Sequence, residues 1–147
     1  MISLINWKVN GVSSKEYSSL FNDLYNKEIN NSNLNIVSKY SAKIGLMYIS
    51  DYIYSSKVED WNTAVGRYVD EDGANPNDNW MYIGAREWTI THDYENDDMV
   101  GMLDDTGSIG FYPEAGEFGI RPVFYLNSDV ELAGGSGTST DPYRIKI

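Results

Sequence analysis

The sequence contains no cysteine, and this absence excludes several kinds of site at once. Without thiols the chain can form no disulfide, no thiolate nucleophile and no cysteine-ligated zinc site. The lack of cysteine does not determine the cellular compartment, because an exported protein can do without disulfides when its core is large enough.

Basic residues are also scarce, since 11 Lys and Arg stand against 22 Asp and Glu and give a formal net charge of −11. A field of this sign repels phosphate backbones and anionic lipids, so we expect no nucleic-acid partner and no membrane contact. From Asp93 to Glu117 there are eight acids and no Lys or Arg. A solvated, solubilising surface explains this stretch at least as well as a cation site does.

No signal peptide and no long hydrophobic run is visible, which indicates either a cytoplasmic protein or a chain trimmed at its N-terminus. The aromatic content, in contrast, is high at 14%, with 12 tyrosines. Disordered chains are poor in aromatic residues, so we expect this chain to fold. Its length of 147 residues suits a single domain over 1–147, and no internal repeat suggests a second one.

Motifs for acyl transfer, zinc hydrolysis and nucleotide chemistry are absent, because the sequence has no GxSxG, HExxH or phosphate-loop pattern. His92 is the single histidine, and beside its acidic neighbours it could act as a general base or metal ligand. Simple exposure at a strand end is the favoured interpretation. Paired carboxylates could serve a glycosidase, but among 22 acids some pairs lie close by chance.

The first third of the chain predicts a strand followed by a helix. Residues 2–12 are expected to form a strand that ends at Gly11. Ser13 and Glu16 have the spacing of a capping box for a helix over 14–29. Apolar residues at spacings of three and four form one stripe on this helix. They are Tyr17, Leu20, Phe21, Leu24 and Tyr25.

The middle of the chain predicts one buried strand, a short helix and a long loop. The apolar run 43–49 is expected to be a buried strand, after an extended piece over 34–40. Ser50 and Asp51 then resemble the N-cap of a short helix. The polar segment 57–79 is expected to be a surface loop, anchored by Trp61.

From residue 80 onward the pattern predicts antiparallel β-structure. Asp104 to Gly107 has the composition of a four-residue hairpin turn between strands 99–103 and 108–112. Further strands are expected at 80–84, 87–91, 120–126 and 143–147. The fold class is therefore α+β, with a mainly antiparallel sheet, one amphipathic helix and one short helix.

Two groups of oxygen-bearing side chains are candidate calcium sites, although no cofactor is predicted with preference. For both groups we favour solvated loops over ion sites, since Asp, Asn and Gly are the usual residues of turns. The first group is Asp70, Asp72, Asn75, Asn77 and Asp78. The second group is Asp97, Asp98, Asp104 and Asp105.

Arg121 interrupts an otherwise apolar strand, and a buried arginine needs a carboxylate or carbonyl partner. We predict a structural ion pair with an acid such as Glu87 in preference to ligand binding. Trp80 and Trp88 are expected to pack in the core, with an exposed aromatic patch as the alternative.

Several blocks occur in an order that resembles a C-terminal domain of secreted and prepilin-like surface proteins of Gram-positive bacteria. The resemblance covers residues 41–147, and residues 1–40 would join the domain to an N-terminal membrane or pilin-type helix. The blocks are KIGLMYISDYIY (43–54), NW (79–80), EWTI (87–90), GIRPVFYLNSDV (119–130) and GxGT…DPYRI (135–145).

A more distant resemblance is to the C-type-lectin-like fold, in the branch that contains formylglycine-generating enzymes. The residues that carry it are Gly119, Ile120, Arg121 and Pro122. Enzymes of that branch work through a pair of cysteines, which this chain lacks, so the resemblance implies the fold without the oxidase chemistry.

The resemblance implies a non-catalytic recognition or surface-structural module, extracellular or on the cell surface, that binds a protein or a glycan. Binding is expected through the acidic loops over 57–79 and 93–117. A minor pilin-like assembly subunit and a glycoside hydrolase with paired carboxylates are the alternatives, and the oligomeric state stays open. The ligand-binding candidates are Trp61, Asp97, Asp98, Asp104 and Asp105.

Overall fold

A computed structural model describes residues 2–9, 11–12, 23–30, 38–56, 79–138 and 140–146. The predicted capping box at Ser13 and Glu16 lies outside these ranges, as does Trp61. The first calcium candidate, Asp70, Asp72, Asn75, Asn77 and Asp78, lies outside them as well.

The main sheet has five strands and is built around one long central strand, β5 (Glu87–Asp93). On one side β5 pairs antiparallel with β6 (Met99–Leu103), which pairs antiparallel with β7 (Ile109–Pro113). On its other side β5 pairs in parallel with two short strands at different points along its length. These are β2 (Gly11–Val12) near its end and β8 (Gly119–Ile120) near its start.

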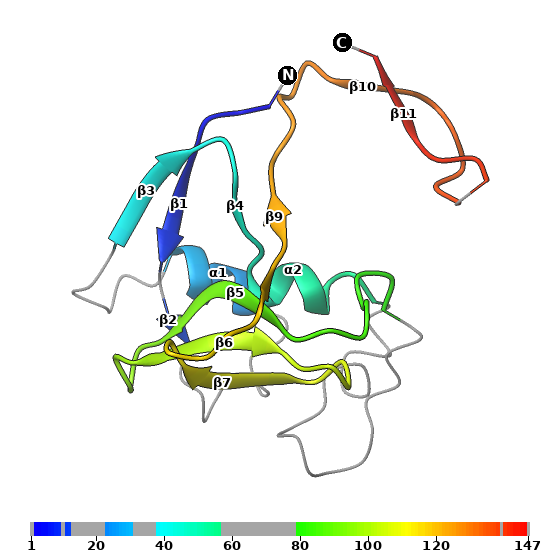
Figure 1. Ribbon diagram of the computed structural model, residues 1–147. Helices are drawn as coiled ribbons and strands as arrows, with labels where there is room; N and C mark the ends of the chain where they lie inside the picture. The colour runs from blue at the N-terminus through cyan, green and yellow to red at the C-terminus, as the bar shows by residue number, and fades with distance from the viewer. Residues whose placement is uncertain are drawn as a thin grey trace.

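Three two-stranded antiparallel ribbons complete the described β-structure (Figure 1). The ribbon of β10 and β11 stands away from the rest of the molecule (Figure 1). The pairs are β1 (Ile5–Val9) with β3 (Ser38–Ala42), β4 (Gly45–Leu46) with β9 (Pro122–Val123), and β10 (Glu131–Gly134) with β11 (Arg144–Lys146).

Two short helices, α1 (Leu24–Asn30) and α2 (Ile49–Ile53), cover one face of the main sheet. Their apolar side chains join those of the hairpin strands in a single core. Mostly antiparallel strands with two short helices confirm the predicted α+β class for the described residues. The core residues are Val12, Leu24, Met47, Ile49, Tyr52, Ile53, Leu103 and Ile109.

The predicted strand over 43–49 is wrong for most of its length. Only Gly45 and Leu46 form a strand, and the helix α2 already begins at Ile49. The reason is local: the carboxylate of Asp51 accepts a hydrogen bond from the backbone N–H of Tyr48 at 2.9 Å. Asp51 thus stabilises the helix from its third residue and not from the predicted N-cap position, which Tyr48 occupies.

The predicted strand over 80–84 is a turn instead. The N–H of Tyr82 donates to the carbonyl of Asn79 at 3.1 Å, and the side-chain oxygen of Asn79 accepts the N–H of Met81 at 2.9 Å. Asn79 is itself buried and donates through its side-chain amide to the carbonyl of Tyr52 at 2.8 Å. An asparagine that bonds its own backbone two residues on competes with strand pairing.

The predicted strand over 120–126 is divided into two short pieces at Arg121. Before Arg121 the chain pairs with β5 as β8, and after it the chain pairs with β4 as β9. The predicted hairpin between β6 and β7 is confirmed, because the N–H of Gly107 donates to the carbonyl of Asp104 at 3.0 Å. Gly107 has a φ of 86°, a conformation that favours glycine.

Along β5 the polar residues face the core and the larger apolar residues face away from it. The side chains of Thr89 and Thr91 are buried, whereas Trp88 and Ile90 are half-buried on the opposite face. Thr89 offsets its burial by donating to the carbonyl of Gly101 at 2.8 Å. This alternation leaves apolar side chains on the face of the sheet that the helices do not cover.

Candidate binding groove

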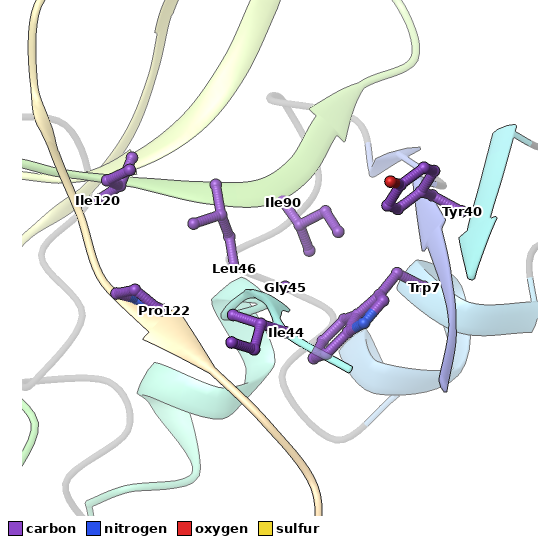
Figure 2. Close-up of a pocket in the computed structure, with 8 residues that line it drawn as sticks. All are labelled: Trp7, Tyr40, Ile44, Gly45, Leu46, Ile90, Ile120 and Pro122. Carbon is purple, nitrogen blue, oxygen red and sulfur yellow. The ribbon is translucent and has the colours of Figure 1, made fainter. Parts of the chain in front are cut away.

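An apolar groove of about 370 Å³ lies between the β1–β3 ribbon, the β4–β9 ribbon and the uncovered face of β5 and β8 (Figure 2). Its volume falls in the range of ligand-binding pockets, about 300–1,000 Å³. Three of its residues are largely exposed although apolar: Tyr40 at 71%, Ile44 at 56% and Ile120 at 66%. The full lining is Trp7, Tyr40, Ile44, Gly45, Leu46, Ile90, Ile120 and Pro122.

The indole of Trp7 forms a fixed part of the groove wall (Figure 2). Trp7 is 1% exposed, and its Nε1–H donates to the carbonyl of Ala42 at 3.0 Å. Its ring lies against Tyr48 at 6.3 Å and Tyr125 at 5.5 Å between ring centroids. Gly45 lies directly against this ring, and a Cβ at that position would overlap it.

A backbone hydrogen bond joins the groove to the main sheet. The N–H of Ile90 donates to the carbonyl of Met47 at 2.9 Å, so the segment after β4 occupies the gap on β5 between β8 and β2. The groove is therefore held by strands from four separate parts of the sequence, near residues 7, 40–46, 90 and 120 (Figure 1).

The chemistry of the groove is apolar, because its lining residues include no carboxylate, imidazole or basic side chain. The phenol of Tyr40 is the single titratable group in the lining. General acid–base catalysis and metal ligation both require polar side chains that converge on one point. What such a lining can do is receive an apolar group and remove it from water.

The four aspartates predicted as one ligand or calcium site do not come together. Asp97 and Asp98 precede β6, whereas Asp104 and Asp105 follow it. A strand rises about 3.3 Å per residue, so the two pairs are about 20 Å apart along β6. The four carboxylates therefore cannot hold one calcium ion together, whereas ligand binding by either pair stays a prediction.

Asp104 and Asp105 instead build the β6–β7 turn. The carboxylate of Asp104 accepts the N–H of Thr106 at 3.0 Å, and Arg86 Nε lies 3.5 Å from both carboxylates. Burial raises the pKa of Asp104, and the hydrogen bond from Asp104 lowers the pKa of Asp105. These contacts agree with the favoured interpretation that the acids are turn residues.

The β5–β6 turn is organised in a similar way by its own acid. The carboxylate of Asp93 accepts the N–H of Glu95 at 3.1 Å and the side-chain amide of Asn96 at 2.7 Å. His92 lies within β5, and its Nε2 is 3.0 Å from the carbonyl of Asp97. The imidazole thus contacts backbone within a turn.

Arg121 and Glu87 form the predicted ion pair. The Nε of Arg121 donates to Glu87 at 3.0 Å, and its second terminal nitrogen contacts the other carboxylate oxygen. The remaining terminal nitrogen donates to the carbonyl of Met81 at 2.7 Å. All three contacts lie within the protein, in line with the structural role predicted for this pair.

The two tryptophans predicted in the core lie elsewhere. Trp80 is 80% exposed at the tip of the turn after Asn79, so its core assignment is wrong. Trp88 is half-buried on the groove side of the sheet, with its ring centroid 4.6 Å from that of Phe118. Each error has its own physical reason: β5 turns its threonines inward and Trp88 outward, and residue 80 lies in a turn.

Glu28 on α1 is a buried carboxylate that was not among the predicted site residues, and it is 0% exposed. It accepts the N–H of Ile49 at 3.0 Å, the N–H of Ser50 at 3.2 Å and the hydroxyl of Thr91 at 2.5 Å. The amides belong to the first turn of α2, where carboxylates are favoured. Burial raises the pKa of Glu28 to about 7.

The spacing of the predicted stripe contained a signal for Glu28. Residue 28 lies four positions after Leu24 and three after Tyr25, so it continues the apolar stripe of the helix. A carboxylate in line with such a stripe must find buried hydrogen-bond donors. No comparable signal was available for Tyr40, Ile44 or Ile120, because their partners in the groove come from distant segments.

Within the described ranges no group of three or more His, Asp or Glu side chains is placed to hold a metal ion. No helix among the same residues has the length and apolar character needed to span a bilayer. Comparisons with protein-family models, with curated proteins and with solved structures find no match to this chain.

Proposed function

We propose that this protein is a non-catalytic recognition module whose apolar groove receives an apolar side chain from a partner protein. The observation that carries the proposal is the set of exposed apolar residues, Tyr40, Ile44 and Ile120, around a concave surface. Exposure of apolar side chains to water is unfavourable, and their burial under a partner stabilises the complex. Aromatic anchors in such pockets dominate the energetics of protein interfaces.

The lining favours a protein partner over a glycan in this groove. Sugars need hydrogen-bonding side chains around an aromatic ring, and the groove offers a single phenol, that of Tyr40. A leucine or phenylalanine side chain needs no such groups, because its whole contribution comes from burial. A glycan surface at Trp80 is the second candidate, since its ring lies open to solvent.

We include in the same proposal the specific fold and the location that the resemblance implies. They are a C-type-lectin-like fold and a location outside the cell or on its surface. Arg121 of the Gly119–Pro122 element, which carries the resemblance, is held by its ion pair with Glu87 on β5. A pilin-like assembly role stays an alternative, and it predicts a longer helix through residues 13–29.

A peptide-display selection on the immobilised chain tests the groove. We expect selected peptides to share a large apolar residue, and we expect Tyr40→Asp and Ile120→Asp to weaken their binding about tenfold or more. Both side chains are largely exposed, so neither change should unfold the chain. Leu132→Asp on β10, at a position 70% exposed and outside the groove lining, is the matched control and should bind normally.

The same selection can contradict the proposal. Peptides that bind Tyr40→Asp as tightly as the native chain would place recognition on another surface. If no peptide is selected, and a glycan on an array binds the native chain but not Trp80→Ala, the partner is a sugar and not a protein.

A further inference from the structure

We infer that the segment received by the groove carries acidic residues beside its apolar anchor. The inference rests on the proposed function and goes one step beyond it, because it assigns the charge of the partner. It also runs against the net charge of −11, which by itself predicts a basic partner.

The strands that form one wall of the groove are basic although the protein is acidic. Lys8 lies on β1, Lys39 on β3, and Lys43 in the connection from β3 to β4. Residues 2–9 and 38–46 contain these three lysines and no Asp or Glu. The groove-lining strands on the opposite wall, over 119–123, also contain no acid.

Two of the lysines face each other across the ribbon. In the antiparallel register Lys8 lies directly opposite Lys39, beside the pair of Trp7 and Tyr40. Opposed residues of this kind have Cβ atoms about 5 Å apart, and like charges there are destabilising. Among the described residues the ion pairs are made by Arg86, Arg121 and Arg144, so no carboxylate in those ranges neutralises the lysines.

A repulsive pair of this kind indicates a binding role, because a bound partner can relieve the repulsion that the free chain retains. The sequence holds 22 acids and only 11 bases, yet two of the bases lie face to face, and no carboxylate of the described residues forms an ion pair with either. Local rules of this sort are broken mainly where a binding or catalytic site requires it. An acidic residue on the partner would remove the repulsion and gain an ion pair.

The alternation of the ribbon fixes where the partner's acids must lie. Trp7 and Tyr40 point into the groove (Figure 2), so Lys8 and Lys39 emerge on the other face of the same strands. Their long stems can reach round the outer strand β3, and Lys43 lies next to the groove residue Ile44. The acids therefore flank the apolar anchor, outside the groove itself.

Salt screening determines which charges of this protein act on a bound partner. At physiological ionic strength charges more than about 8 Å apart are largely screened when exposed. The acids of the described turns lie on the β5–β6 and β6–β7 connections, whereas Lys43 lies next to the groove residue Ile44, and Lys8 and Lys39 lie on the strands that hold Trp7 and Tyr40. The contacting charges therefore dominate the choice of partner.

Three peptides that share a Leu-Phe core and differ only in flanking Glu, Gln or Lys residues test the inference. Calorimetric titration at physiological salt should give the Glu peptide an affinity about three- to tenfold higher than the Gln peptide, and the Lys peptide the lowest. Lys39→Glu should abolish the preference for Glu and also raise the melting temperature, because it pairs with Lys8 across the ribbon. Lys146→Glu, the same charge change on β11, should leave the order of the peptides unchanged.

The outcomes separate this inference from the proposed function. If all three peptides bind equally, and Tyr40→Asp weakens all three, the groove is confirmed and the acidic partner is wrong. Tighter binding of the Lys peptide would also show that the acidic partner is wrong, and it would mean that the net charge of the protein determines the preference. If no peptide responds to Tyr40→Asp, the groove function itself is contradicted. An anionic lipid vesicle that binds in place of the Glu peptide would overturn the protein partner.

Discussion

Single residues with several buried contacts are where the fold is most sensitive to substitution, and Arg121 is the foremost example. Its guanidinium contacts both carboxylate oxygens of Glu87 and the carbonyl of Met81. The Glu87 side chain is 6% exposed, so removal of its partner would leave a buried charge without compensation. The ion pair therefore links the turn after Asn79, the strand β5 and the connection between β8 and β9.

Arg121→Met should lower the free energy of unfolding by about 3 kcal/mol, because it leaves the Glu87 carboxylate buried and unpaired. Urea denaturation followed by tryptophan fluorescence measures the loss. The double variant Arg121→Met with Glu87→Gln removes the orphaned charge and should recover about half of it. A loss below about 0.5 kcal/mol in the single variant would show that the pair is solvated in practice.

The residues that could be predicted from the sequence share one property: their partners are set by a strong local requirement. A buried Arg requires an acid, and this predicted the pair of Arg121 and Glu87. The exposure of Trp80 could not be predicted, because a tryptophan in an aromatic, β-branched run is usually core. The hydrogen bonds of Asn79, which hold that segment as a turn, involve Tyr52 on a different element.

At the scale of elements, turn chemistry was a better guide than hydrophobic runs. The Asp-Asp-Thr-Gly composition predicted the β6–β7 turn at the observed residues. The apolar run 43–49, in contrast, holds a two-residue strand and the start of a helix, because Asp51 bonds the N–H of Tyr48. An apolar run reports burial, and both a strand and a short helix can satisfy it.

The glycine of the β6–β7 turn gives a direct test at this scale. Gly107→Ala should lower the free energy of unfolding by about 1–2 kcal/mol, because a Cβ is strained at the observed φ of 86°. Gly110→Ala on the adjacent strand is the control, since its Cβ would meet the Met102 sulfur at an ordinary 3.6 Å. That variant should stay within about 0.5 kcal/mol of the native chain. Equal melting temperatures for the two variants would mean that the turn conformation differs from the one described.

For the whole molecule, the long-range arrangement was the least predictable feature. The groove unites strands from residues near 7, 45, 90 and 120, and no local pattern reports such a convergence. Which face of β5 turns toward the core was also set by a long-range contact, since Thr91 faces inward and donates a hydrogen bond to Glu28 on α1. One carboxylate therefore joins α1, α2 and the main sheet, and its ionisation should govern the stability of the entire fold.

Glu28 predicts that the protein is more stable at mildly acidic pH than at alkaline pH. Burial raises the pKa of Glu28 from 4.5 to about 7, while hydrogen bonds from Ser50 and Thr91 oppose the change and Asp51 adds to it. Below about pH 4.5 the carboxyl is protonated in both the folded and the unfolded chain. Between about pH 4.5 and pH 7 only the unfolded chain releases the proton, so the free energy of unfolding falls as pH rises.

The total loss across this window should be about 3 kcal/mol, and chemical denaturation at a series of pH values measures it. Glu28→Gln should flatten the slope, because the variant has no proton to release at this position. The relief of net negative charge on acidification acts in the same direction, so a surface variant with the same change in charge is needed for comparison. Glu114→Gln, at an exposed position in the turn directly after β7, provides it and should keep the native slope. Parallel pH profiles for the native chain and Glu28→Gln would show that Glu28 is ionised throughout the window, held by the two amides of α2.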